Sequence, residues 1–194
     1  FVAGSVRDRG LARMRQAGDA MPMGPGWQPE TVLGPMISAD QRDRARSFVD
    51  EGRGGDAEIV HGGNVLDGPG FFLAPAIAID PKPGSRLLRE EIFGPVTCVQ
   101  TFSGTDLDAL AAAANDTPYG LAASVWTRDL ATAHAMAARL KVGVVGINHH
   151  GGTDVLAPFG GMKQSGWGRE NGEESLDHYL ETKSVVTRYQ WSGG

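Results

Sequence analysis

The chain contains a single cysteine, Cys98, among 194 residues. One thiol cannot form an internal disulfide, and no second thiol stands at the spacing of a zinc site. The 18 basic residues are outnumbered by 23 acidic ones and are not clustered, so nothing favours a nucleic-acid backbone. No apolar run reaches the ~18 residues of a membrane helix, and the amino end lacks the order of a secretion signal. We therefore expect a cytoplasmic protein without nucleic-acid or membrane partners.

Two phosphate-binding motifs are also absent. Neither Gly-x-Gly-x-x-Gly nor Gly-x-x-x-x-Gly-Lys occurs among the 28 glycines, so the usual backbone cradles for phosphates are missing. The glycines have no three-residue period, which indicates tight turns rather than a fibrous chain. The chain begins at Phe1 without a methionine. We expect this of a fragment, a processed product or a trimmed chain.

The middle of the chain alternates short apolar runs with amphipathic stretches. Strands are expected at residues 57–60, 71–79, 96–102, 122–127 and 142–147. Helices are expected after caps at Ser38, Thr105 and Asp129, and also over residues 1–17. Strands joined through helices must run in the same direction, so the pattern predicts an α/β fold with a mostly parallel sheet and flanking helices. One core suffices at this length, and we expect one domain.

Residues 182–189 form the last patterned segment. Their alternation predicts a strand with one polar face, but no neighbouring strand is evident in this chain. An unpaired strand at a terminus can add to a sheet of another molecule. We therefore expect a main domain at residues 1–181 and an oligomerisation strand and tail at residues 182–194, in a homo-oligomer.

Residues 90–95 read Glu-Glu-Ile-Phe-Gly-Pro, and the glycine and proline fix a turn. A carboxylate held at such a turn could accept hydrogen bonds from a ribose diol, and the neighbouring aromatic could cover a nicotinamide. On the residues alone, a solvated pair of surface glutamates is the alternative.

Residues 158–170 read Pro-Phe-Gly-Gly-Met-Lys-Gln-Ser-Gly-Trp-Gly-Arg-Glu, a glycine-rich loop that contains Lys163 and Arg169. Such loops often bind phosphates, but the P-loop spacing is not matched. The adjacent His149 and His150 suggest a metal site, yet neighbours in an extended chain point to opposite sides. We expect no metal there.

Taken in order, residues 90–96 and 158–170 resemble the closing half of the aldehyde dehydrogenase superfamily. The resemblance extends from about residue 30 through Val186 by way of residues 33–38, Gly62-Gly63 and residues 114–123. It implies that residues 1–181 belong to the catalytic domain of a parent enzyme. That enzyme would oxidise a small-molecule aldehyde to a carboxylate with NAD or NADP.

The resemblance also implies roles for residues at the cofactor. Glu91 would hold the nicotinamide ribose, and Phe93 would pack by the ring. Gln41 and Arg44 match helix positions that in many relatives touch the ribose or phosphates, although the usual lysine at the second position is arginine here.

At the substrate, the resemblance implies that Phe159 lines the aldehyde tunnel and that Glu170 supports the route of water and protons. His149 and Thr153 fall in the segment that selects the substrate, which lacks the aromatic residues of many relatives. Arg169 would brace the structure or a subunit contact.

The superfamily reaction needs a thiolate, and Cys98 is the only sulfur nucleophile. It stands in an apolar strand, where burial raises the pKa of a thiol and blocks access, so we expect an inert core residue. In relatives the reactive cysteine lies shortly before the segment that Phe1 continues. We therefore expect the carboxyl-terminal part of an enzyme, inactive alone and not binding NAD or NADP by itself, that works with a complementary amino-terminal half. A non-catalytic interaction module and a truncated remnant are the alternatives.

Overall fold

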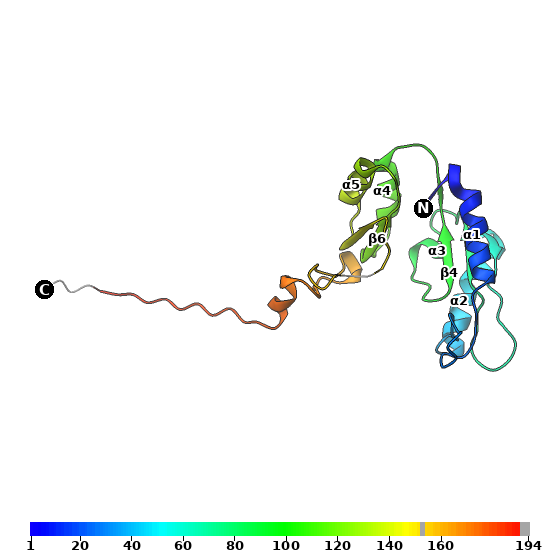
Figure 1. Cartoon of the computed structure of the whole chain (residues 1–194), viewed down its shortest axis with the longest axis horizontal. Coiled ribbons are helices and arrows are strands. Elements are labelled where there is room, and N and C mark those ends of the chain that lie inside the picture. The colour runs from blue at the N-terminus through cyan, green and yellow to red at the C-terminus, as the bar shows by residue number, and fades with distance from the viewer. Residues whose placement is uncertain (152–153, 191–194) are drawn as a thin grey trace. The chain divides into compact units, whose positions relative to one another are not determined.

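The computed structural model describes residues 1–151 and 154–190. Backbone contacts divide the chain into two compact units, a first unit at Phe1–Asp106 and a second unit at Leu107–Gly194. Figure 1 labels the elements of both units, each of which is described by itself. The division lies inside the single domain expected at residues 1–181, and the boundary at residue 181 stays a prediction.

The first unit is built around a three-stranded sheet with the order β2-β3-β4. β2 pairs antiparallel with β3, and β3 pairs parallel with β4. A separate parallel pair joins β1 and β5. The elements are β1 (Val2–Ala3), η1 (Gly4–Val6), α1 (Arg7–Asp19), α2 (Ala39–Glu51), η2 (Gly52–Asp56), β2 (Glu58–His61), β3 (Ala76–Ile79), α3 (Arg86–Arg89), β4 (Val96–Val99) and β5 (Thr101–Phe102).

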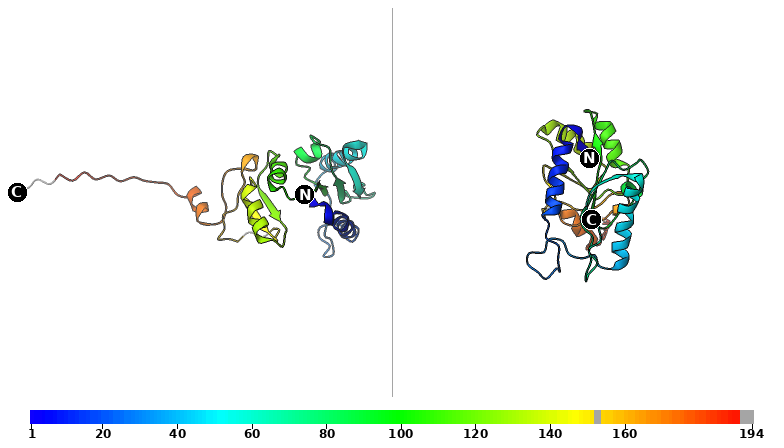
Figure 2. Two further views of the ribbon diagram at one scale, coloured as in Figure 1. Left: turned by 90° about the horizontal axis from the view of Figure 1, so that it is seen from above. Right: turned by 90° about the vertical axis from the view of Figure 1, so that its right-hand side faces the viewer.

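The sheet of the first unit is covered on both faces. Alternate side chains of β3 point to opposite sides, so Ala78 joins a core cluster with Phe48 of α2, whereas Ile77 and Ile79 join one with Leu11 of α1. Figure 2 shows α1 and α2 on opposite sides of these strands. This layering explains why β3 is buried at every position.

The second unit contains a parallel strand–helix–strand motif. β6 and β7 pair in register from Ala122 opposite Val144 to Val125 opposite Ile147, and α5 connects them. The Asp129 carboxylate caps α5 by accepting hydrogen bonds from the amides of Ala131 and Thr132. The elements are α4 (Leu107–Asn115), β6 (Ala122–Val125), α5 (Leu130–Arg139), β7 (Val144–Ile147), η3 (Lys163–Ser165) and η4 (Glu173–His178).

The predicted α/β class is confirmed, with two differences in the strands. The expected strand at residues 71–79 is regular only from Ala76, because Phe71 and Leu73 form isolated bridges with Met36 and Val65 instead. The strand β2 runs antiparallel at one edge of the sheet. Antiparallel edge strands are common on otherwise parallel sheets.

Residues 182–190 are exposed and carry no regular element. Among the strands of the described residues, none pairs with this segment. The oligomerisation strand therefore stays a prediction. None of the described helices is both long and apolar enough to cross a membrane.

Candidate functional site

The turn after α3 exposes two of the residues predicted to contact the cofactor. Glu91 is exposed, and the Phe93 side chain is 73% exposed. Phe93 also has φ +54°, a left-handed conformation that non-glycine residues rarely adopt. Ile92, between them, is buried in the core cluster with Ala45 and Phe48. The turn is therefore fixed at its centre while its two flanking side chains face outward.

Arginines from two helices hold this turn. The Nη1 of Arg44 donates to the Ile92 carbonyl oxygen at 2.8 Å, and its Nη2 lies 3.6 Å from a Glu90 carboxylate oxygen. Arg86 donates to both carboxylate oxygens of Glu90, at 2.7 and 3.2 Å, and also pairs with Glu51. The hydrogen bond from Arg86 lowers the pKa of Glu90. Glu90 is therefore a structural carboxylate, whereas Glu91 faces outward.

Gln41 lies one turn before Arg44 on α2. Its backbone amide donates to the Ser38 hydroxyl at 3.2 Å, which caps the helix as predicted. Its side-chain Oε1 is buried and has no hydrogen-bond partner among the described residues. A buried acceptor without a donor costs free energy, and Gln41 Oε1 has too little accessible surface in this conformation to meet a bound group.

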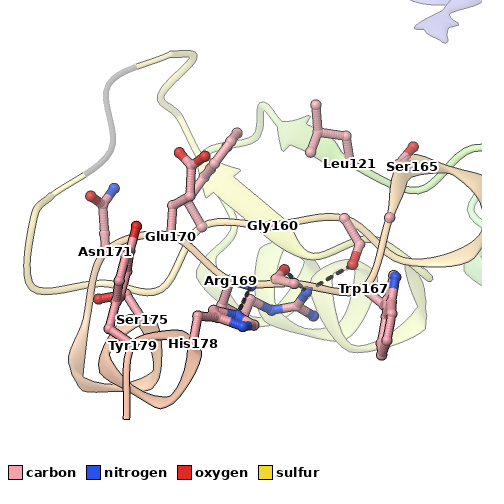
Figure 3. A pocket seen from close by; sticks show the side chains of 14 residues that line it. Leu121, Gly160, Ser165, Trp167, Arg169, Glu170, Asn171, Ser175, His178 and Tyr179 are labelled. Carbon is pink, nitrogen blue, oxygen red and sulfur yellow. Dashed lines mark hydrogen bonds between the residues drawn. The ribbon is translucent and has the colours of Figure 1, made fainter.

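Phe159 and Glu170 are brought together in the second unit. They form an isolated antiparallel bridge in which each amide donates to the other residue's carbonyl oxygen at 2.7 Å. The bridge lies in the wall of a cavity of about 620 Å³ (Figure 3). The wall is formed by residues 159–161 and 165–171 together with Leu121, Ser175, His178 and Tyr179.

The two cations of the glycine-rich loop are both engaged by backbone carbonyl groups. Arg169 Nη1 donates to Gly161 O and to Gly168 O, each at 2.8 Å. Lys163 Nζ donates to Asn115 O at 3.0 Å and to Thr117 O at 3.1 Å, near the end of α4. Figure 3 shows the Glu170 carboxylate and the Arg169 guanidinium pointing away from each other. The loop therefore uses its positive charge for its own folding.

Close backbone packing explains the glycines around this loop. A Cβ on Gly143 would lie 1.6 Å from the Gly160 carbonyl oxygen, and one on Gly160 would lie 2.2 Å from that of Gly168. These separations leave no room for a side chain. The glycines thus bring the loop against the start of β7.

The remaining residues predicted to line the substrate site follow β7. His149 is exposed. The neighbouring His150 has its Nδ1 3.1 Å from the Ser124 hydroxyl of β6. Thr153 lies outside the described residues. Within the described part of the chain, no group of three or more metal-ligating side chains comes together.

Comparison with known proteins decides the family. A sequence model described as "Aldehyde dehydrogenase family" matches residues 1–185. The chain belongs to the aldehyde dehydrogenase family. The predicted resemblance is therefore confirmed.

Individual aldehyde dehydrogenases agree with this match. Betaine aldehyde dehydrogenase 1 of Rhizobium meliloti is 42% identical over 188 residues, and the match covers 95% of this chain and 38% of the relative. The mitochondrial aldehyde dehydrogenase of Leishmania tarentolae is 39% identical over 185 residues, with 95% and 37% covered. An NAD⁺ complex of the aldehyde dehydrogenase from Bacillus cereus superposes with a TM-score of 0.91 at 36% identity, covering 98% of this chain and 38% of that one. The chain thus spans about 38% of the length of these curated relatives.

The one sulfur nucleophile of this aldehyde dehydrogenase chain is unsuited to attack. Cys98 packs into the core cluster that contains Ala78 and Leu87, and its Sγ donates to the Leu87 carbonyl oxygen at 3.3 Å. Burial raises the pKa of this thiol to about 11. At neutral pH the thiol is therefore protonated, and the residue is partly buried.

The residues predicted for the site fall into two sets. Gln41, Arg44, Glu91 and Phe93 belong to the first unit, and Phe159, Glu170 and His149 to the second. Sequence reasoning missed His178, whose Nε2 accepts from the Arg169 amide at 3.2 Å and which lines the cavity. Its only sequence signal was its place in a short helix after the loop.

Proposed function

We propose that this chain is the carboxyl-terminal part of an NAD(P)-dependent aldehyde dehydrogenase that oxidises an aldehyde to a carboxylate, and that it is inactive alone. The contrast between the outward-facing Glu91 and Phe93 and the partly buried Cys98, whose thiol has a raised pKa, carries this proposal. Groups suited to a cofactor are accessible, whereas the sulfur is protonated and packed. The match to about 38% of the length of curated relatives supports the assignment to part of an enzyme.

The residues of the first unit suit the nicotinamide end of a dinucleotide. The Glu91 carboxylate can accept hydrogen bonds from two ribose hydroxyls, and the exposed Phe93 ring offers a flat apolar surface. When bound, NAD or NADP accepts the hydride that leaves the aldehyde carbon. The NAD⁺ complex of the Bacillus cereus relative supports this choice of cofactor.

The residues of the second unit suit the aldehyde and water. Phe159 offers an apolar wall, and the exposed Glu170 carboxylate can accept a proton from water. The backbone pair between them fixes the spacing of these two groups. We assign the selection of the aldehyde to His149 and Thr153.

The nucleophile and the dinucleotide cradle must come from outside this sequence. Aldehyde oxidation through a thioester needs a thiolate, and the pKa of Cys98 is about 11. We therefore assign residues 1–181 to the catalytic portion and residues 182–194 to an oligomerisation strand and tail. The partner is a complementary amino-terminal half, in a cytoplasmic homo-oligomer.

A complementation assay tests this proposal. The isolated chain should give no NADH or NADPH formation with a mixture of aldehydes. Mixing it with the amino-terminal part of a related aldehyde dehydrogenase, ending before the position of Phe1, should restore turnover. The same amino-terminal part with its reactive cysteine replaced by alanine is the control and should stay inactive. Normal turnover by the isolated chain would contradict the proposal.

A non-catalytic interaction module is the second candidate. It is favoured by the exposure of residues 182–190, in which Val185 and Val186 are 81% and 91% exposed. An unpaired segment that exposes apolar side chains among polar ones can add to the sheet of another chain. Tight association with the amino-terminal part without activity would favour this reading. Removal of residues 182–194 should then abolish the association.

A further inference from the structure

The turn that carries Glu91 and Phe93 has an uncommon backbone conformation. Phe93 has φ +54°, in the left-handed region that residues with a Cβ rarely occupy. Its ring is mostly exposed, so packing of the ring does not hold the turn. Contacts of neighbouring groups must therefore supply the restraint.

Two neighbours of Phe93 anchor the turn to α2. Ile92 is buried in the cluster that contains Ala45 and Phe48. A Cβ on Gly94 would lie 2.7 Å from the Cβ of Ala45, so the backbone there passes directly over the helix. The turn thus rests on the helix that carries Arg44.

Arg44 acts on the peptide group between Ile92 and Phe93. Its Nη1 donates to the Ile92 carbonyl oxygen at 2.8 Å. This oxygen and the Phe93 nitrogen belong to the same planar peptide group. A fixed oxygen therefore fixes the orientation of this peptide plane. The φ angle of Phe93 is measured relative to that plane. No other side chain among the described residues is seen to donate to this carbonyl oxygen.

The guanidinium of Arg44 is itself held in place. Its Nη2 lies 3.6 Å from Glu90, and its centre lies 5.1 Å from the centre of the fully buried Phe48 ring. Arg86 lies over the same ring at 4.5 Å and binds the same Glu90 carboxylate. A planar guanidinium can donate to a carbonyl oxygen, pair with a carboxylate and lie over an aromatic ring at the same time. The compact ammonium group of lysine lacks this planar geometry.

We propose that Arg44 is a positioning residue that holds the left-handed turn at Phe93, and so keeps Glu91 and Phe93 directed outward, rather than a ligand of the cofactor's ribose or phosphates. The inference rests on the proposed function because that proposal has Glu91 and Phe93 contact the cofactor. The sequence position of Arg44 alone predicted contact with the cofactor, and the inference replaces that role. Both of its Nη atoms already face groups of this chain.

Backbone NMR of the full chain tests the inference without nucleotide. Wild type is compared with Arg44→Lys and Arg44→Gln, and Arg46→Lys is the matched control. Arg46 lies on the same helix but pairs with Asp50 at 3.2 Å on an exposed surface. The Cα and Cβ shifts and the HN–Hα coupling of Phe93 report its φ angle, and amide exchange reports opening of the turn.

In wild type we expect the signature of a positive φ at Phe93. Both Arg44 variants should lose it, and the Val96 amide, which donates to the Gly94 carbonyl oxygen within this turn, should exchange about tenfold faster or more, whereas Arg46→Lys should stay within about twofold of wild type. Unchanged signals of Ala45 and Phe48 establish that α2 is intact. If Arg44→Gln does not fold, Arg44→Lys decides the question because it keeps the charge and most of the stem.

Retention of the Phe93 shifts and of the Val96 exchange rate in a folded Arg44 variant would overturn the inference. That outcome is independent of the cofactor, because no nucleotide is present. A failed complementation assay counts against the proposed function only. Unchanged NMR signals count against the role of Arg44 only.

Discussion

Phe159 and Glu170 are eleven positions apart in the chain, yet their backbones pair through two reciprocal hydrogen bonds of 2.7 Å. The glycine-rich loop between them closes on itself through Arg169, which donates to Gly161 O and Gly168 O. The apolar wall and the carboxylate are therefore set by one short hairpin-like segment. A change within that segment should alter both groups together.

Replacing Arg169 should loosen this pair. Arg169→Ala removes two hydrogen bonds to carbonyl groups, at a cost of about 1–2 kcal/mol in local stability. We expect amide exchange at Phe159 and Glu170 to become about 5–30-fold faster, as measured by NMR or mass spectrometry. Arg188→Ala, in the exposed segment 182–190, is the control and should change neither rate. Equal rates in both variants would show that Arg169 does not hold the loop.

Two glycine substitutions should have opposite effects. A Cβ at Gly143 would lie 1.6 Å from Gly160 O, so Gly143→Ala should destabilise the chain by about 2–3 kcal/mol. Gly10 lies within α1 with nothing within 4 Å of such a Cβ, and Gly10→Ala should stabilise it by about 0.5–1 kcal/mol. Urea unfolding measures both. Similar midpoints for the two variants would refute the close packing at Gly143.

The Cys98 thiol should resist alkylation. With a pKa of about 11 in the folded chain, fewer than about one thiol in a thousand is ionised at neutral pH. Iodoacetamide should therefore label the folded chain at least about 100-fold more slowly than the chain in urea, and the rate should rise as the pH approaches the pKa. Mass spectrometry follows the label. Rapid labelling of folded protein at pH 7 would remove the basis for calling Cys98 inert.

The cap of α5 should make a pH-dependent contribution to stability. A hydrogen bond from the Thr132 hydroxyl, together with the amides of Thr132 and Ala131, lowers the pKa of Asp129 below its ordinary value near 3.8. The contribution of the carboxylate to the stability of the folded chain is therefore complete above the ordinary pKa. It is lost as the pH falls through the lower pKa that Asp129 has in the folded chain. Asp129→Ala should lower the urea midpoint at pH 7, and this difference from wild type should shrink at acid pH.

Asp129→Asn serves as the matched control for that prediction. Its amide oxygen can still accept from the amides of Ala131 and Thr132, but it does not titrate. We expect a midpoint close to that of wild type at pH 7. A difference between wild type and Asp129→Ala that does not change with pH would contradict the assigned role of the carboxylate.

Local chemistry explains which elements could be predicted. The caps at Ser38 and Asp129 and the apolar stripes that follow them depend on residues within a few positions, and both helices form where expected. The strand expected at residues 71–79 was too long, because Phe71 and Leu73 pair with Met36 and Val65. The periodicity of residues 71–79 says nothing about pairing with residues outside that segment.

The sequence by itself determined the family, the α/β class, the lack of a second thiol and the identity of the outward-facing groups at the Glu91 turn and the glycine-rich loop. Only the tertiary structure decided that Arg44 meets the Ile92 carbonyl group, 48 positions away, and that Lys163 and Arg169 meet backbone oxygens. A long cationic side chain can reach a ligand or a neighbouring carbonyl group equally well. Which of the two it binds depends on whether the fold places a backbone oxygen within about 3 Å of the cationic group. The local sequence does not reveal that distance.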